Sequence, residues 1–273
     1  MQHIAQIMGG KLIGNHGSTE IHYLVIDSRK IIFPESSLFF AIKGPHHDGH
    51  DYIQKSIEGG ILNFVISDVN KINPSELLIA SGAGRSDKNI PDICYILVED
   101  TLEALQKLAG FHRNQFKIPI IGITGSNGKT IVKDWLSHVL SVEFNVCKNP
   151  KSYNSQVGVP LSVWNLQPET EIGIFESGIS QKSEMHKLEN ILNPTIGIFT
   201  NIGSAHEENF ASKEEKILEK LRLFKKTDAI ILHSDDTAIE RATRKTYPNK
   251  KIITWGGNEQ ATYHFNFKKK QTP

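Results

Sequence analysis

The chain has 273 residues, with 31 basic and 30 acidic side chains. A charge balance this close to neutral gives no electrostatic reason to expect nucleic acid or an anionic membrane as a partner, and the length suggests about two globular domains. No apolar run approaches the roughly 20 residues that cross a bilayer, and the first ten residues lack the features of a secretory signal. The two cysteines, Cys94 and Cys147, are expected to be reduced thiols in a cytoplasmic protein.

Residues 1–112 are predicted to form a small α/β domain. Helices are expected near residues 4–8, at 51–58 and after Asp100, where Glu103 provides a capping partner. Residues 70–92 are polar and contain Gly, Asn and Pro, which predicts an irregular connection. The expected strands of this domain are 24–26, 38–42, 61–66 and 95–98.

Residues 113–273 are predicted to form a mostly parallel sheet covered by helices, because strand and helix patterns alternate along this part of the chain. Ligands of such sheets bind beyond the carboxyl ends of the strands. Three polar segments follow expected strands in this way: a glycine-rich turn at 125–130, Glu176, and the segment 201–206. The expected strands are 118–123, 171–175, 195–199, 229–232 and 251–254, and the expected helices are 129–140, 183–192 and 212–225.

The glycine-rich turn indicates a phosphate-binding loop. Glycines allow backbone N–H groups to converge on anionic oxygens, and the N-terminus of the following helix adds a partial positive charge. A lysine at the helix start can reach terminal phosphates, and the next hydroxyl can ligate Mg²⁺. The candidate ATP-binding residues are Gly125, Ser126, Asn127, Gly128, Lys129 and Thr130.

The loop departs by one residue from the standard mononucleotide pattern, which has four residues between its first glycine and the Gly-Lys pair. Gly122 stands one position too early for that pattern. The alternative is a tight turn that binds nothing, although Gly-Lys-Thr at a helix start favours phosphate binding. The helix itself is supported by one apolar stripe at helical spacing, formed by Ile131, Val132, Trp135, Leu136, Val139 and Leu140.

Three further side chains are candidates for chemistry at the same sheet edge. Glu176 follows an apolar strand and is placed to contact Mg²⁺, the alternative being a solvated loop glutamate. His206 also follows a strand, where it could meet a metal or phosphate or simply be exposed. Lys220 borders the apolar stripe of its helix, and its spacing alone favours a lysine that snorkels to solvent.

The order of these motifs resembles that of a known enzyme family. The segments 125–130, Glu-Ser-Gly at 176–178, Asn-Ile-Gly-Ser-Ala-His at 201–206 and Glu-Lys-Leu-Arg-Leu-Phe at 219–224 are similar to those of the Mur ligase family, which builds the peptide of bacterial cell-wall precursors. Segments 27–29, 38–44 and 48–50 resemble the family's uridine-nucleotide module. The resemblance covers nearly the whole chain, and segment 152–161 is most similar to the members that add D-alanyl-D-alanine.

The resemblance implies an ATP-dependent amide-bond ligase that uses Mg²⁺ and joins D-alanyl-D-alanine to a UDP-N-acetylmuramoyl tripeptide through an acyl phosphate. It implies that Lys129 holds the β and γ phosphates, that Thr130 and Glu176 hold one Mg²⁺, and that His206 supports a second metal. It also implies that Lys220 is carbamylated, which would turn an ammonium into a carboxylate-like metal ligand. The substrate-binding residues that it implies are Ser28, Arg29, Asp48, Gly49, His50 and Asn154.

The family has a third, C-terminal domain, and this chain is expected to be a fragment that ends within an incomplete central domain. Alone it is expected to bind the UDP-sugar and some nucleotide weakly, but not to turn over. The parent protein could be fused to an alanine racemase. Two alternatives are a ligase like folylpolyglutamate synthase, which tends to carry glycine at the position of Thr130 and lacks the uridine-type module, and a nucleotide-binding module without ligase chemistry.

Overall fold

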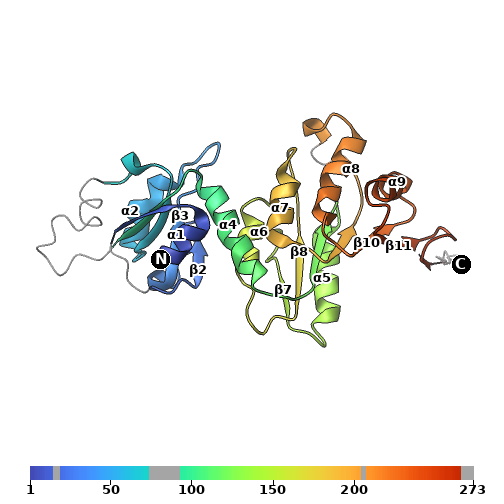
Figure 1. Ribbon diagram of the computed structural model, residues 1–273, viewed down its shortest axis with the longest axis horizontal. Coiled ribbons are helices and arrows are strands. Elements are labelled where there is room, and N and C mark those ends of the chain that lie inside the picture. Colours follow the sequence, from blue (N-terminus) through green and yellow to red (C-terminus); the bar gives the residue numbers. More distant parts are fainter. Residues whose placement is uncertain (15–18, 74–92, 204–206, 266–273) are drawn as a thin grey trace, which may run out of the picture. The chain divides into compact units, whose positions relative to one another are not determined.

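The computed structural model describes residues 1–14, 19–73, 93–203 and 207–265, and Figure 1 labels its elements. The chain divides into two compact units, Met1–Phe111 and His112–Pro273. The α/β class expected from the sequence is confirmed for both. No helix among the described residues is long and apolar enough to cross a membrane. Both cysteines are free thiols.

The first unit is built on a five-stranded sheet with the order β1-β5-β4-β3-β2. Its strands pair in parallel, except that β1 runs antiparallel to β5. Phe39, Phe64 and Tyr95 lie side by side in register and form the centre of its core. The strands are β1 Lys11–Gly14, β2 Tyr23–Val25, β3 Ser37–Phe40, β4 Asn63–Ile66 and β5 Cys94–Leu97, and the helices are α1 Gln2–Met8, α2 Ile53–Glu58 and α4 Thr101–Asn114, which ends in the second unit.

The second unit contains a seven-stranded sheet with the order β12-β11-β10-β9-β6-β8-β7, in which every pair is parallel. The expected mostly parallel sheet is therefore confirmed. The strands are β6 Ile120–Thr124, β7 Val146–Lys148, β8 Ile172–Glu176, β9 Ile196–Phe199, β10 Ala229–His233, β11 Lys251–Gly256 and β12 Tyr263–His264. The helices are α5 Lys129–Leu140, α6 Gly158–Val163, α7 Glu184–Leu192, α8 Lys213–Leu221 and α9 Thr237–Thr246.

Strand β6 lies where the strand order reverses, because the chain continues to β7 and β8 on one side and to β9 on the other. Ligands of open α/β sheets bind at such a switch point, beyond the carboxyl ends of the strands. The register aligns these ends, since Ile123 pairs with Glu176 of β8 and Thr124 pairs with Phe199 of β9. Three segments that are distant in sequence therefore leave the sheet side by side.

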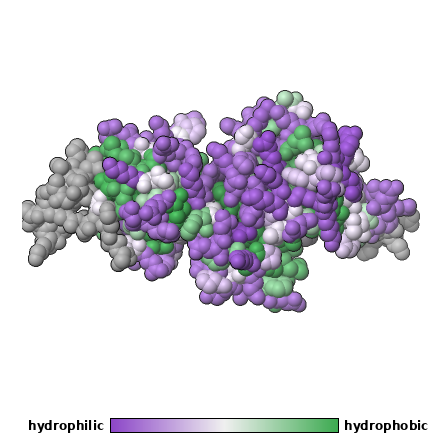
Figure 2. Space-filling model, viewed as in Figure 1, coloured by the Kyte–Doolittle hydropathy of each residue, from purple (hydrophilic) through white to green (hydrophobic). Residues whose placement is uncertain are grey.

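The apolar stripe predicted for α5 divides into two faces. Val132, Leu136 and Leu140 pack against a cluster formed by residues of β6 and β8. Trp135 and Val139 are 75% and 66% exposed, and Ile131 is exposed as well. Figure 2 shows hydrophobic side chains gathered at the lower edge of the second unit, where α5 ends. The sheet thus covers only half of the apolar arc that the sequence displays.

Candidate active site

The loop between β6 and α5 has a backbone that requires glycine at its first position. Gly125 has φ +145°, and a Cβ there would lie 2.0 Å from the Thr200 hydroxyl. Gly128 has φ +79° directly before α5, with nothing within 4 Å of a Cβ. Glycine adopts both conformations without the steric cost that a side chain would add. The loop therefore passes close to the β9 end while its other end stays open.

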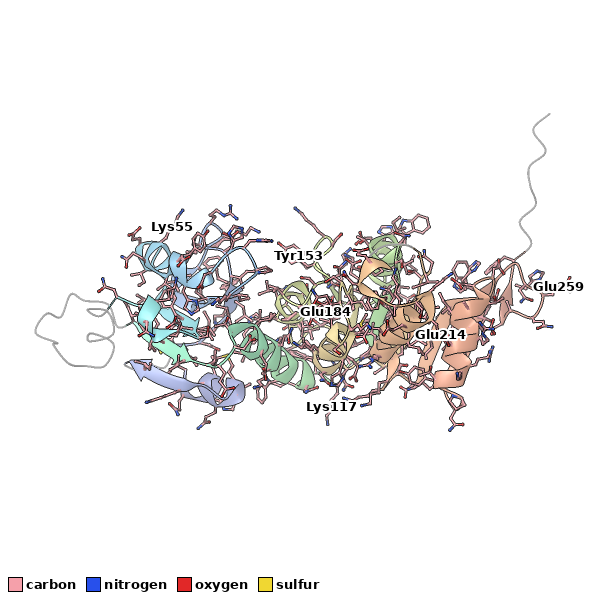
Figure 3. All side chains as sticks on the ribbon, turned by 90° about the horizontal axis from the view of Figure 1, so that it is seen from above. Lys55, Lys117, Tyr153, Glu184, Glu214 and Glu259 are labelled. Atoms are coloured by element: carbon pink, nitrogen blue, oxygen red, sulfur yellow. The ribbon has the colours of Figure 1, made fainter. Side chains whose placement is uncertain are left out.

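Three lysines surround this loop, and two of them are buried. Lys216 and Lys220 are 2% and 3% exposed, whereas Figure 3 shows charged side chains such as Lys55 and Lys117 at the outside of the ribbon. Burial of an ammonium group is unfavourable unless a partner compensates its charge. The buried ammonium groups therefore need hydrogen-bond partners in the loop they face.

The ammonium groups of these lysines donate to backbone carbonyls around the loop. Lys129 Nζ bonds to Gly125 O at 2.9 Å and Ser126 O at 3.1 Å, and Lys220 Nζ bonds to Gly125 O at 3.1 Å. Lys216 Nζ bonds to Gly203 O at 2.6 Å. In the described part of the chain, none of the three forms an ion pair with a carboxylate. The loop therefore carries a positive charge suited to an anionic ligand.

Two of the amides assigned to phosphate from the sequence are bonded within the protein. Ser126 N donates to Asn201 O at 2.9 Å, and Asn127 N donates to Asn201 Oδ1 at 3.0 Å. The amides of the first turn of a helix have no intrahelical acceptor. In this conformation, the amides of Gly128, Lys129 and Thr130 are the ones suited to bind an anion.

Thr130 and Glu176 bring two hard oxygen donors together. Thr130 Oγ1 donates to Glu176 Oε2 at 2.8 Å, and Glu176 is fully buried at the end of β8. Neighbouring ligands of an octahedral Mg²⁺ lie roughly 2.8–3.0 Å apart, given bonds of about 2.0–2.1 Å. The donor types and their spacing fit this ion. The described residues contain no group of three His, Cys, Asp or Glu side chains that could hold a metal ion by itself, so such a Mg²⁺ would also use phosphate or water oxygens.

A loop between β7 and α6 lies over this pair of oxygens. Ser152 Oγ is 3.3 Å from Thr130 Oγ1, and Asn154 Nδ2 donates to Glu176 Oε1 at 3.3 Å. Asn154 is one of the predicted substrate-binding residues, whereas Ser152 is not. A serine in a polar loop carries no signal of its own, because its contact with Thr130 depends on the path of the loop.

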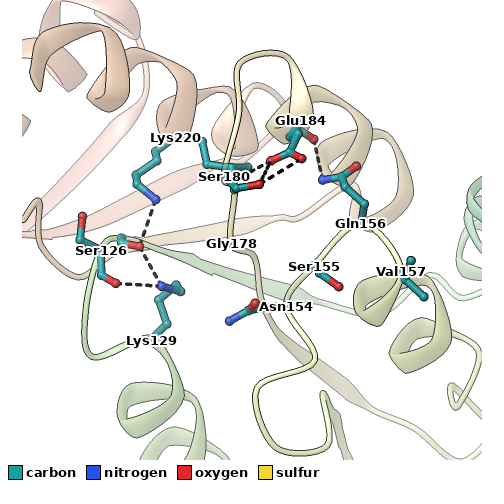
Figure 4. A pocket seen from close by; sticks show the side chains of 12 residues that line it. Ser126, Lys129, Asn154, Ser155, Gln156, Val157, Gly178, Ser180, Glu184 and Lys220 are labelled. Carbon is teal, nitrogen blue, oxygen red and sulfur yellow. Dashed lines mark hydrogen bonds between the residues drawn. The ribbon is translucent and has the colours of Figure 1, made fainter. Parts of the chain in front are cut away.

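A cavity of about 390 Å³ opens beside the loop. Lys129 and Lys220 enter it from one side, and Asn154 and Gln156 line the other side. Figure 4 shows both lysines directed at the same turn of the main chain, and Glu184 bonded to Ser180 at the opposite wall. The cavity therefore has a cationic wall next to the candidate Mg²⁺ ligands and a polar wall facing it.

The interpretation of Lys220 as a snorkelling residue is wrong, because its ammonium points inward to the loop. Burial, together with the charges of Lys129 and Lys216, lowers the pKa of Lys220 to about 7. Burial also lowers the pKa of Lys129, which the charge of Glu176 partly offsets. His206 lies outside the described residues.

The first unit contains a second cavity, of about 400 Å³. Ser28 and Arg29, two of the predicted substrate-binding residues, line it. The Arg29 guanidinium bonds both carboxylate oxygens of Asp27 at 2.9 Å, which lowers the pKa of Asp27 to about 2. The remaining lining residues are Ile26, Asp27, His47, Tyr52 and Lys55.

The other three predicted substrate-binding residues of this unit form a turn in which Gly49 and His50 are buried and Asp48 is partly exposed. His50 is 3% exposed, its Nδ1 lies 2.6 Å from Asp48 Oδ1, and its Nε2 accepts from Ser67 N at 3.0 Å. A Cβ on Gly49 would lie 2.5 Å from Ile42 N. These contacts support a structural role for the turn, and they leave its binding role a prediction.

Family models match both parts of the chain. The model of the Mur ligase middle domain matches residues 123–272, which include the lysine cluster and the Thr130–Glu176 pair. The chain belongs to the Mur ligase family. A second model, the catalytic domain of the Mur ligase family, matches residues 20–113. The family assignment expected from the sequence is therefore confirmed.

Among Mur ligases, this chain is similar to proteins named MurF or UDP-N-acetylmuramoyl-tripeptide–D-alanyl-D-alanine ligase. Those of Bacillus subtilis and Synechocystis are 33% and 32% identical, over 90% and 86% of this chain and 52% and 48% of theirs. The chain thus spans about half the length of these curated relatives. MurF of Acinetobacter baumannii superimposes with a TM-score of 0.78 at 23% identity, covering 94% of this chain and 53% of that one. MurF of Thermotoga maritima, solved in complex with ADP, gives 0.70 at 25% identity, covering 89% and 52%.

Proposed function

We propose that this chain forms the nucleotide site and the UDP-sugar site of an ATP-dependent ligase that joins D-alanyl-D-alanine to UDP-N-acetylmuramoyl-tripeptide. The names of the relatives support these substrates, and the ADP complex of the Thermotoga maritima protein supports the nucleotide. The observation that carries the proposal is the β6–α5 loop with the Lys129 ammonium at its helix end and the Thr130–Glu176 pair of oxygens beside it. A triphosphate would neutralise the charge of this ammonium.

The geometry supports a role for each group. Lys129 would exchange its two carbonyl partners for the β and γ phosphates, while Thr130 and Glu176 would hold Mg²⁺. That Mg²⁺ would supply charge neutralisation on the phosphate oxygens. Support of a second metal by His206 belongs to the same proposal. Cations at this position would let an anionic carboxylate approach an anionic γ phosphate.

The proposed reaction has two displacements. An oxygen of the substrate carboxylate attacks the γ phosphorus, and the bond to the β–γ bridging oxygen breaks, so that ADP leaves and an acyl phosphate forms. The neutral amine of D-alanyl-D-alanine then attacks the acyl carbon. Inorganic phosphate leaves with its bonding electron pair, and the nitrogen loses a proton as the amide forms.

Carbamylation of Lys220 is part of the proposal. A neutral amine adds to the carbon of carbon dioxide and its nitrogen releases a proton to solvent, and the pKa of Lys220, lowered to about 7 chiefly by burial, supplies the neutral amine near pH 7. The resulting carbamate anion would offset the charge of Lys129 and Lys216. A carbamate carbon signal after incubation with ¹³C-bicarbonate, absent in Lys220→Met, is the expected NMR result. No difference between the two proteins would contradict it.

The cavity in the first unit is the proposed site for the UDP part of the substrate. Arg29, Lys55 and His47 line it with nitrogen donors, and Tyr52 offers an aromatic surface. The family model over residues 20–113 supports this choice over a folylpolyglutamate-type ligase, from which the uridine-type module is absent. A cytoplasmic location, where ATP and the UDP-sugar are available, completes the proposal.

Nucleotide binding by the purified chain tests the proposal directly. Calorimetry with Mg·ADP is expected to give saturable binding that Lys129→Ala weakens at least ~10-fold, because a charged hydrogen-bonding partner of the phosphates is lost. Lys117→Ala, a change at an exposed lysine, is the matched control and is expected to bind like the unaltered chain. Equal affinity of Lys129→Ala and the unaltered chain would contradict the phosphate site.

A further inference from the structure

Asn149 occupies an unusual place beside the candidate Mg²⁺ ligands. It is fully buried and follows β7 directly. Strand β7 pairs with β8 up to Lys148, which stands opposite Ile174, and then the main chain turns away. The loop that follows carries Ser152 and Asn154 to the Thr130–Glu176 pair. Asn149 is thus the point at which a regular strand becomes the loop over the site.

The side chain of Asn149 bonds to both backbone groups of Glu176. Its Oδ1 accepts from Glu176 N at 2.7 Å, and its Nδ2 donates to Glu176 O at 3.3 Å. The same Nδ2 donates to Tyr153 O at 2.6 Å. The carboxamide therefore acts as a substitute for a strand backbone. It holds Glu176 at the edge of the sheet after the main chain of β7 has left.

Lys133 fixes the same loop to the other half of the candidate Mg²⁺ site. This lysine is fully buried on α5, about one turn after Thr130. Its Nζ donates to the carbonyl of Lys151. Lys151 has φ +50°, a left-handed conformation that is uncommon for a residue with a side chain. The loop is thus tied to β8 through Asn149 and to α5 through Lys133.

We propose that Asn149 and Lys133 are positioning residues that set the separation between the Thr130 hydroxyl and the Glu176 carboxylate for Mg²⁺. This inference rests on the proposed nucleotide function. The two oxygens come from different elements, α5 and β8, and the fully buried side chains of Lys133 and Asn149 connect the loop to each of them. Octahedral Mg²⁺ tolerates little variation in ligand spacing, so loss of either tie is expected to weaken metal binding before it weakens the contacts of nucleotide with Lys129.

The test measures Mg²⁺ binding apart from nucleotide binding. ADP affinity is determined by calorimetry without divalent metal and then over a series of Mg²⁺ concentrations. Asn149→Ala and Lys133→Met are each expected to raise the Mg²⁺ concentration at half effect by about 10- to 100-fold, the usual cost of losing a residue that orients a metal ligand. Metal-free ADP affinity is expected to change less than ~2-fold, because the hydrogen bonds of these two side chains to described residues go to Lys151, Tyr153 and Glu176 and not to residues 125–130.

Asn165→Ala is the matched control, since Asn165 is exposed and its side chain bonds only a nearby carbonyl, Leu161 O, among the described residues. It is expected to leave the Mg²⁺ midpoint unchanged. A thermal melt of each variant accompanies the titrations. Lys133→Met is the second route to the same answer should Asn149→Ala fail to fold.

The outcomes separate this inference from the proposed function. If the unaltered chain binds ADP with no dependence on Mg²⁺, the metal site is wrong and the positioning role falls with it. If the unaltered chain depends on Mg²⁺ and a folded variant keeps its midpoint, the site stands and the positioning role is overturned. A parallel loss of metal-free ADP affinity and melting temperature, with no selective Mg²⁺ effect, also overturns it, since that pattern indicates a general structural role.

Discussion

At the scale of single residues, the site consists of a few side chains that the ends of the strands and helices hold in place. Lys129, Thr130 and Glu176 could be predicted as site residues from the sequence, because each residue type at a strand end or helix start has its own chemistry. Asn149 and Lys133 could not be predicted in this way. An asparagine after a strand and a lysine within a helix are ordinary on a surface, and their burial becomes apparent only when the path of the β7–α6 loop is known.

Gly125 and Gly128 allow a direct comparison of two glycines in one loop. Gly125→Ala is expected to lower the free energy of unfolding by more than ~2 kcal/mol, because a side chain there has both an unfavourable φ and a clash with the Thr200 hydroxyl. Gly128→Ala is expected to cost only about 1–2 kcal/mol, from its left-handed φ alone. Urea denaturation measures both, and equal losses would contradict the close approach at Gly125.

Lys220 makes stability depend on pH in a predictable direction. Its pKa is lowered from 10.5 to about 7 in the folded chain, so between these values the unfolded chain binds a proton that the folded chain does not. Stability is therefore expected to rise with pH across this window and to be lowest below about pH 7.

The matched comparison for this prediction is Lys220→Met, which keeps an unbranched side chain without a titrating group. Urea denaturation from pH 6 to 9 in carbon-dioxide-free buffer is expected to show the unaltered chain gaining stability relative to Lys220→Met as the pH rises. A constant difference across the series would show that Lys220 keeps its ordinary pKa.

At the scale of secondary-structure elements, hydrophobic periodicity predicted helices α5, α7 and α8 and most strands of the two sheets, and it missed helices α6 and α9 and strands β1, β7 and β12. Strands β7 and β12 have three and two residues, too few for a period to be visible. Their existence follows from pairing with β8 and β11, which is a property of the sheet. The loop over Thr130 and Glu176 begins at the end of β7, so its position could not be predicted without that strand.

Helix α5 shows a second limit of periodicity. A run of apolar residues at helical spacing predicts an apolar arc, but the width of the sheet decides how much of the arc is covered. Here the covered half faces β6 and β8, and Trp135 stays 75% exposed. The sequence pattern alone does not show that Trp135 is exposed while its neighbour Leu136 packs against the sheet.

Substitutions on the two faces of α5 are expected to differ in their effect. Trp135→Ser is expected to change the free energy of unfolding by less than ~0.5 kcal/mol, since most of its surface already contacts solvent. Leu136→Ala is expected to cost about 2 kcal/mol, because Leu136 packs against the apolar cluster. Urea denaturation distinguishes them, and a larger loss for Trp135→Ser would show that this face is covered in solution.

At the scale of the whole chain, sequence patterns predicted two α/β parts and the sheet class of the second. The order of the strands could not be read from the sequence, because parallel pairing is set by crossover connections and not by local pattern. It is this order that places β6 between β8 and β9 and so brings the loop, Glu176 and Asn201 together.

The two cavities are expected to bind their ligands through different charges. Lys55→Ala is expected to weaken binding of UDP-N-acetylmuramoyl-tripeptide by about 5- to 10-fold, through loss of a cation near the diphosphate. Mg·ADP affinity is expected to stay unchanged in this variant, and Lys117→Ala serves again as the control. Calorimetry with each ligand measures both effects. Unchanged affinity for the UDP-sugar would show that its diphosphate does not bind beside Lys55.

A crystal structure of the chain with a non-hydrolysable ATP analogue and Mg²⁺ is the decisive test of the proposed nucleotide site. We expect the phosphates to contact the amides of residues 128–130, Lys129 Nζ to leave the carbonyls of Gly125 and Ser126 for phosphate oxygens, and Mg²⁺ to bind Thr130 Oγ1 and Glu176. A nucleotide bound elsewhere, or a Lys129 that keeps its two carbonyl partners beside bound nucleotide, would contradict the proposed site.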